Sequence, residues 1–236
     1  MNIALAWSWV RQSVEYLKKR PFELSLLFFA YVLLNIVLNM LPIINRISGL
    51  FQPLFMVAFY YACVQINNNQ PVTPGSIFLG FRSSMRFELL KLGAINALWT
   101  FLVMYASTWV DDGFLWKFLN NKQALSEMKE LPLKELMPGM SFVMLFYVGF
   151  TSITCFAIPL IEFKKVPVFK ALFFSVYGFF KHTQVLLVFG LILIGMTLIV
   201  SLILAGIPIL MAPAMVVMSM LVYFCQYPMY KSLFGE

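Results

Sequence analysis

Three glutamates lie where basic residues give way to long apolar runs. Glu23 and Glu88 each occupy the middle of a Phe-Glu-Leu tripeptide. Arg20 and Lys91 lie three residues away from them, and Glu162 precedes two lysines at the end of another run. Such pairs on a helix contribute about 0.3–0.5 kcal/mol when exposed. The pattern favours interfacial ion pairs that fix the depth of membrane helices. The alternative is a cytoplasm-facing polar cluster that binds a lipid headgroup or a proton.

A second group of polar residues lies inside the apolar runs. Four amides are candidates to line a cavity: Asn35, Asn39, Gln52 and Asn96. The competing interpretation is that they form hydrogen bonds between packed helices. Three prolines also fall inside apolar runs, namely Pro53, Pro159 and Pro213. They predict helix kinks satisfied by neighbouring helices, and they are the best sequence indication of a cavity.

The chain carries no motif of an intramembrane enzyme, which would need a nucleophile with a base, or metal ligands. The sole histidine, His182, follows Lys181 at the start of an apolar run, as expected of a solvated boundary residue. The sequences HExxH and GxSxG and the Walker motif are missing from the chain. Cys63, Cys155 and Cys225 lie in apolar runs and are expected to be small buried hydrophobes. We therefore expect no catalytic residue, cofactor or metal.

The composition indicates whether water or lipid surrounds these residues. Of 236 residues, 61% are hydrophobic and 11% are charged, whereas soluble domains carry about 25% charged residues. Apolar runs of about 20 residues match the thickness of a bilayer core. The net charge of +7 resides on basic residues that flank these runs, which favours a membrane surface over nucleic acid as a partner. The pattern predicts an all-α integral membrane protein.

Six membrane-spanning helices are expected from the apolar runs and their breakers. They are Phe22–Leu41, Ile47–Ile66, Leu89–Val110, Met140–Ile161, Gln184–Leu204 and Pro208–Tyr227. The short segment "PIINRISG" is expected to connect the first two spans. Twelve of the seventeen Lys and Arg flank the spans on the side of the two termini. The positive-inside rule therefore predicts that both termini are cytoplasmic.

The single membrane domain, residues 1–236, reads as three units of similar order. Each unit, 1–66, 71–162 and 166–228, begins with a leading segment of about 15 residues and continues with two spans. The leading segments predict two or three interfacial amphipathic helices; in the first, Ile3, Trp7, Val10, Val14 and Leu17 form an apolar stripe. The outer loop, 111–139, is long for a connection and is expected on the outer leaflet surface or against a partner.

The chain resembles an uncharacterised family of bacterial six-span inner-membrane proteins, loosely akin to the YciC-like group. The resemblance rests on "PVTPGSIFLGFR" (71–82), "FAIPLIEF" (156–163) and "KALFFSV" (170–176), within the same order of spans. Thr73 stands where we expect serine before the second leading segment. The resemblance implies an inner-membrane location and no established activity or catalytic residue.

Two functional hypotheses follow from the sequence. The first is a non-enzymatic inner-membrane protein that acts as a structural or accessory subunit, or as a lipid-interacting factor of the bacterial envelope. The second is a carrier or flippase-like transporter of a lipid or amphipathic small molecule. Membrane lipids are the expected partners, with a second copy of the chain or another membrane protein as a further candidate. A polar-lined cavity would favour the transporter, and a close-packed bundle would favour the structural role.

Overall fold

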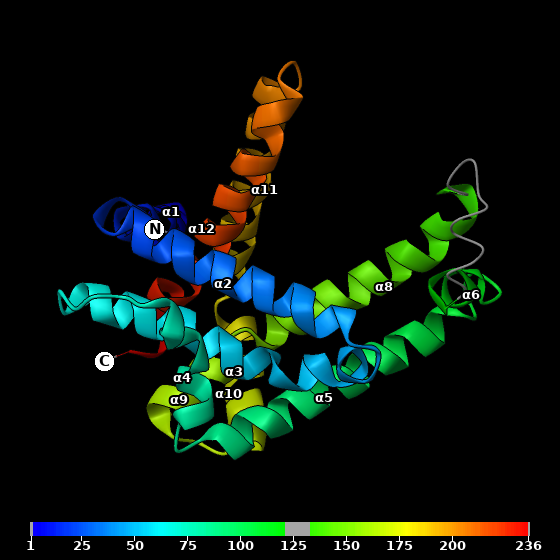
Figure 1. Cartoon of the computed structure of the whole chain (residues 1–236), viewed down its shortest axis with the longest axis horizontal. Coiled ribbons are helices and arrows are strands. Elements are labelled where there is room, and N and C mark those ends of the chain that lie inside the picture. Colours follow the sequence, from blue (N-terminus) through cyan, green and yellow to red (C-terminus); the bar gives the residue numbers. More distant parts are fainter. Residues whose placement is uncertain (1, 121–132, 236) are drawn as a thin grey trace.

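The described part of this computed structural model comprises residues 2–120 and 133–235, without the side chains of residues 2, 42–47, 120 and 208. Within it, all regular structure is helical (Figure 1). The helices are α1 (Asn2–Lys19), α2 (Pro21–Met40), α3 (Pro42–Asn67), η1 (Pro74–Phe78), α4 (Leu79–Arg82), α5 (Arg86–Ser107), α6 (Phe114–Asn120), α8 (Leu133–Thr154), α9 (Ala157–Lys164), α10 (Val168–Lys181), α11 (Thr183–Leu204) and α12 (Pro208–Phe234).

Six helical segments of the described chain are long and apolar enough to cross a membrane. They coincide with the six predicted spans, so the expected all-α integral membrane fold is confirmed. The predicted connection "PIINRISG" is wrong, because that segment forms the beginning of α3 and only Leu41 separates α2 from α3. Pro42 at the first helical position explains the error, since proline begins a helix as readily as it ends one.

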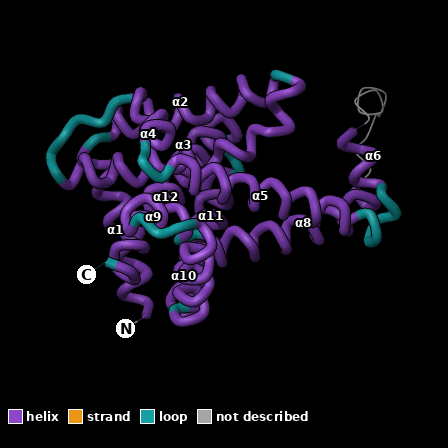
Figure 2. Tube along the Cα trace, turned by 90° about the horizontal axis from the view of Figure 1, so that it is seen from below, coloured by secondary structure: helices purple, strands orange, loops and turns teal. Residues whose placement is uncertain are grey.

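The spans pair into three hairpins, α2–α3, α5–α8 and α11–α12. We call the base the end where α2, α5 and α11 begin, and the tips the end where these helices finish. Both chain termini lie on the base side, and the α11–α12 hairpin extends in a different direction from the α5–α8 hairpin (Figure 1). Figure 2 shows α5 and α8 running side by side, with α6 at their tips. The hairpins therefore meet at the base and diverge toward the tips.

Each leading segment packs on the hairpin of another predicted unit. The helix α1 contacts α11 and α12, the η1–α4 segment contacts α2 and α3, and α10 contacts α8 and α9. The predicted stripe on α1 is divided between two faces, because Ile3 and Trp7 are exposed whereas Val10 is buried with Ala6 and Trp9 on the packing face. The threefold repetition remains a prediction, which the similar order of contacts in the three units favours. The interfacial position of the leading segments also remains a prediction.

The core lies at the base. Its largest fully buried side chains include Trp9, Phe59, Phe156 and Phe224, which come from α1, α3, the α8–α9 junction and α12. By contrast, no residue in the most apolar 18-residue stretch of α11 is buried inside the protein. A helix so apolar and so exposed requires lipid around it, because water would not cover that surface favourably.

Pro159 accompanies a break in the fourth span, as predicted for these prolines, whereas Pro53 and Pro213 lie inside uninterrupted helices. The break separates α8 from α9, and the buried hydroxyl of Ser175 on α10 fills it. This hydroxyl donates to the carbonyl of Ile153 at 2.7 Å and accepts from the N–H of Phe156 at 3.1 Å. A freed backbone group inside a membrane needs such a partner.

Candidate functional site

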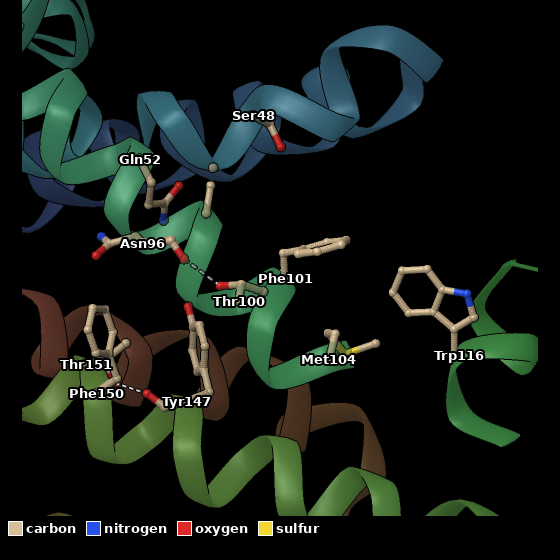
Figure 3. Close-up of a pocket in the computed structure, with 12 residues that line it drawn as sticks. Ser48, Gln52, Asn96, Thr100, Phe101, Met104, Trp116, Tyr147, Phe150 and Thr151 are labelled. Atoms are coloured by element: carbon tan, nitrogen blue, oxygen red, sulfur yellow. Dashed lines mark hydrogen bonds between the residues drawn. The ribbon is translucent and has the colours of Figure 1, made fainter. Parts of the chain in front are cut away.

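Two adjoining cavities lie among the spans and together form what we call the polar cavity. One, of about 460 Å³, lies between α3, α5, α6 and α8 (Figure 3). The other, of about 510 Å³, lies between α3, α5, α8 and α12. Four residues line both parts: Gln52, Asn96, Tyr147 and Thr151. The two parts of the polar cavity therefore adjoin at the meeting point of the three hairpins.

The close approach of α3 and α5 positions two of these residues. At Gly93, a built Cβ would lie 2.1 Å from the backbone oxygen of Leu50, so only glycine permits the two backbones to pack at this distance. Asn96 lies one turn further along α5, and Gln52 lies opposite it on α3 (Figure 3). The amide of Gln52 donates to the hydroxyl of Tyr31 on α2. Three helices from two hairpins thus hold this wall of the cavity.

Most hydroxyl groups on the cavity walls already donate their protons. Thr100, Thr151, Thr154 and Ser219 each donate to a carbonyl one turn earlier on their own helix, at 2.9 Å in every case. Their oxygen lone pairs therefore remain as acceptors for another molecule. The side-chain oxygen of Asn96 is buried and has no hydrogen-bond partner among the described residues. The cavity consequently offers several acceptor oxygens, beside the side-chain amide groups of Asn96 and Gln226.

The charge and the shape of the polar cavity limit the kind of molecule that it can bind. None of the described residues that line the polar cavity is ionisable as an acid or a base except the phenols of Tyr147 and Tyr223 and the thiol of Cys155. Toward the tips the walls are apolar, with Phe101, Met104 and Trp116 (Figure 3). Such a cavity suits a neutral group that donates hydrogen bonds, such as a hydroxyl, attached to an apolar body. It is poorly matched to an anion.

Of the four amides proposed for the cavity, only Gln52 and Asn96 lie among its lining residues. Asn35 and Asn39 lie on α2, where each donates its side-chain amide to a backbone carbonyl four residues earlier. The sequence reasoning missed Tyr147, Thr151 and Gln226, which line the cavity from α8 and α12. Their signal was weak, since tyrosine and threonine are ordinary members of apolar spans.

The predicted ion pairs of the first two glutamates are present at the base. Glu23 accepts from Arg20 at 2.9 Å, and Glu88 accepts from Lys91 at 2.5 Å. Their second oxygens accept backbone N–H groups that begin the next leading segment, Val72 at 2.7 Å and Val168 at 2.8 Å. Val168 is the first residue of α10, whose N–H has no partner within its own helix. Glu88 therefore caps α10 from a different helix.

Glu162 differs from the exposed pair that the sequence suggested, because its side chain is only 3% exposed. One oxygen accepts from the hydroxyl of Tyr61 at 2.8 Å and from Lys165 at 3.3 Å. The other accepts from the hydroxyl of Ser83 at 2.5 Å. This carboxylate links the end of α9 to α3 and to the segment before α5. No hydrogen bond among the described residues joins the three glutamates into one cluster.

Cys63 and Cys225 are buried free thiols, and Cys155 is a partly buried one. Among the described residues, no group of three or more His, Cys, Asp or Glu is arranged to hold a metal ion.

The fold and the cavity define a class, the multi-pass α-helical membrane proteins with an intramembrane cavity. The chain is similar to a curated protein of Burkholderia thailandensis named "probable inner membrane protein". The two are 28% identical over 245 aligned residues, which cover 96% of this chain and 90% of that protein. No family model matches the chain, and no solved structure matches it. The six apolar spans and this likeness support a multi-pass inner-membrane protein.

Proposed function

We propose that this protein is a non-enzymatic, lipid-interacting factor of the bacterial envelope that holds a lipid or other amphipathic molecule in the polar cavity. The observation that carries the proposal is the buried, unpartnered oxygen of Asn96 in a cavity lined by acceptors. A buried polar atom without a partner costs about 1–3 kcal/mol. A ligand that donates a hydrogen bond to Asn96 offsets this cost.

A purely structural role accounts less well for the cavity. A bundle that serves only as a scaffold gains most by packing its helices closely, because empty space forfeits dispersion contacts. Here the helices instead leave about 510 Å³ next to five polar side chains that α3, α5 and α8 supply. We therefore propose that these spans bind a ligand in addition to forming the fold.

The second candidate is a carrier or flippase-like transporter of the same kind of molecule. It is favoured by the extent of the cavity, which reaches from the meeting point of the hairpins to Trp116 at the tips. At the base, the hydrogen bond from Tyr60 to Gln226 at 2.7 Å and that from Trp9 to Ser232 at 2.8 Å join α12 to α3 and α1. A transporter would have to open this base in a second conformation.

The proposal also includes the orientation of the chain in the membrane and its relation to other proteins. With the base in the cytoplasm, as the basic residues indicate, the end of the cavity near Trp116 lies on the periplasmic side. A reporter fused near Asn121 should read periplasm, and one fused after Glu236 should read cytoplasm. Kinship with the YciC-like group and association with a second copy or another membrane protein remain part of the proposal.

Native mass spectrometry of the full chain released from lipid nanodiscs tests the bound molecule. The wild type should retain a lipid or amphipathic adduct. Replacing the acceptor in N96L should reduce adduct occupancy about tenfold, which corresponds to one hydrogen bond of about 1.4 kcal/mol. N39L is the matched control, because Asn39 is an exposed amide outside the cavity lining. A bare wild-type monomer, or equal losses in N96L and N39L, would refute the proposal.

A further inference from the structure

A separate pocket lies at the base, where the ends of three helices meet. It has a volume of about 480 Å³ and is formed by α9, the last turns of α10 and the end of α12. Three basic side chains line it, Lys164, Lys181 and His182, and none of its described lining residues is acidic. It shares no described residue with the polar cavity. A pocket of this composition attracts an anion.

The charge of this pocket has no counterion within the described chain. Glu162 is two residues from Lys164, yet it pairs with Lys165. Neither Lys164 nor Lys181 forms an ion pair with any described residue, and the amino group of Lys181 lies 5.9 Å from the centre of the Tyr177 ring. Burial first, and then the charge of Lys181, lower the pKa of His182. Both burial and a nearby positive charge disfavour the protonated imidazole.

The apolar wall of the pocket depends on the last turn of α12. A Cβ built at Gly178 would lie 2.3 Å from the ring of Phe234, so glycine allows this ring to pack directly on α10. Leu160 and Phe174 complete the apolar part of the lining. The pocket thus combines cations on one side with hydrocarbon on the other, as the headgroup and first acyl carbons of a phospholipid require.

The outer face of α10 indicates that the anion comes from a membrane. Phe169, Phe173, Tyr177 and Phe180 recur every three or four residues on α10 and are 75%, 68%, 57% and 65% exposed. A row of exposed aromatic rings beside lysines is typical of a helix that lies in the headgroup region with its apolar face in the acyl chains. This depth places the pocket at the level of the phosphate groups.

We propose that this pocket binds the phosphate group of an anionic phospholipid from the leaflet at the base. Lys164 and Lys181 donate to the phosphate oxygens in this arrangement, and Phe174 and Phe234 pack against the glycerol and first acyl carbons. Basic pockets between membrane helices recognise anionic headgroups in this way, and hydrogen bonds between two charged groups are the stronger kind.

The test uses the full chain in micelles of a neutral maltoside detergent, where no charged surface contributes to binding. Dioleoyl phosphatidylglycerol is titrated in, and native mass spectrometry measures the bound lipid; dioleoyl phosphatidylcholine serves as the lipid without net charge. Each lysine beside an anionic lipid gives about a fivefold gain in affinity. The variant K164Q/K181Q should therefore bind phosphatidylglycerol about 25-fold more weakly than the wild type.

The matched control is K170Q/K231Q. It removes the same charge from two exposed lysines of α10 and α12 that do not line the pocket. This control should bind within about threefold of the wild type, because its lysines lie outside the proposed contact. Equal weakening of the two double variants, or equal retention of the two lipids by the wild type, would overturn the proposal. Displacement of phosphatidylglycerol by millimolar inorganic phosphate would also overturn it, since the ligand would then be a free anion.

Discussion

Removing the buried carboxylate of Glu162 should destabilise the fold far more than removing an exposed one. Tyr61 and Ser83 would each lose a charged acceptor, and each unpaired hydroxyl costs about 1 kcal/mol at a partly exposed position. Lys165 is 49% exposed and can turn to water, so its lost ion pair contributes little. We therefore expect E162A to lower the free energy of unfolding by about 2–3 kcal/mol.

The control for this prediction is Glu15, which pairs with Arg11 at 3.1 Å on α1. Its side chain is 50% exposed and that of Arg11 is 76% exposed, so E15A should cost only about 0.3–0.5 kcal/mol. Equilibrium unfolding in mixed micelles of increasing dodecyl sulfate, followed by tryptophan fluorescence, measures both values. The two variants remove the same chemical group, so only burial and partners distinguish them.

A double-mutant cycle tells whether the effect arises from the named contact. The hydroxyl of Tyr61 donates to Glu162, so Y61F and E162A should show a coupling of about 1 kcal/mol. Tyr147 lies in the polar cavity, and Y147F should show no coupling to E162A. Equal destabilisation by E162A and E15A, or additive effects of Y61F and E162A, would refute this account of the base.

Four further predictions concern packing and capping. E23A and E88A should each lower the free energy of unfolding by about 2 kcal/mol, because each leaves a backbone N–H without its acceptor. The corresponding Gln variants should recover about half of that loss. Faster hydrogen exchange at the freed amides of Val72 and Val168 checks the cause. G93A should destabilise the protein by at least 2 kcal/mol in the same assay, because its Cβ meets backbone on α3. G190A should be neutral or stabilising by about 0.5–1 kcal/mol, since nothing lies within 4 Å of its added Cβ. S175A should cost about 2 kcal/mol by leaving two backbone groups of the α8–α9 break unpaired, and unchanged stability there would contradict the proposed role of that hydroxyl.

The spans were predictable because hydrocarbon imposes one simple requirement, a helical apolar run of sufficient length. The first span was expected at 22–41 and occupies Pro21–Met40. The last was expected to end at Tyr227 and continues to Phe234. The chain beyond Tyr227 lay outside the predicted span, but Tyr230 is buried in the core at the base and Phe234 packs against that core. Hydropathy alone does not reveal a helix end that is buried by protein and not by lipid.

The site was only partly predictable, because residue type does not determine the direction of a side chain. Asn39 and Asn96 are both amides inside apolar runs. The first turns back to a carbonyl of its own helix at 2.8 Å, and the second has a buried oxygen without a partner. Which of the two outcomes occurs depends on the rotation of each helix about its axis. That rotation is set by contacts such as the Gly93–Leu50 approach, which lie far apart in the sequence.

The two capping glutamates explain why the hairpins meet at the base and separate at the tips. Glu23 and Glu88 occupy the same position in successive predicted units, and each accepts the N–H that follows a proline, Pro71 or Pro167. A carboxylate can serve this purpose only near water, because charge at the centre of a bilayer costs at least about 2.5 kcal/mol. Among the described residues, the carboxylate ties that join separate segments of the fold lie at the base, whereas Asp111 near the tips accepts only from Gly113 and Leu115 close by in the chain. A molecule that enters the polar cavity between the tips displaces lipid and leaves these ties intact, so binding there should leave the hydrogen exchange of the two capped amides unchanged.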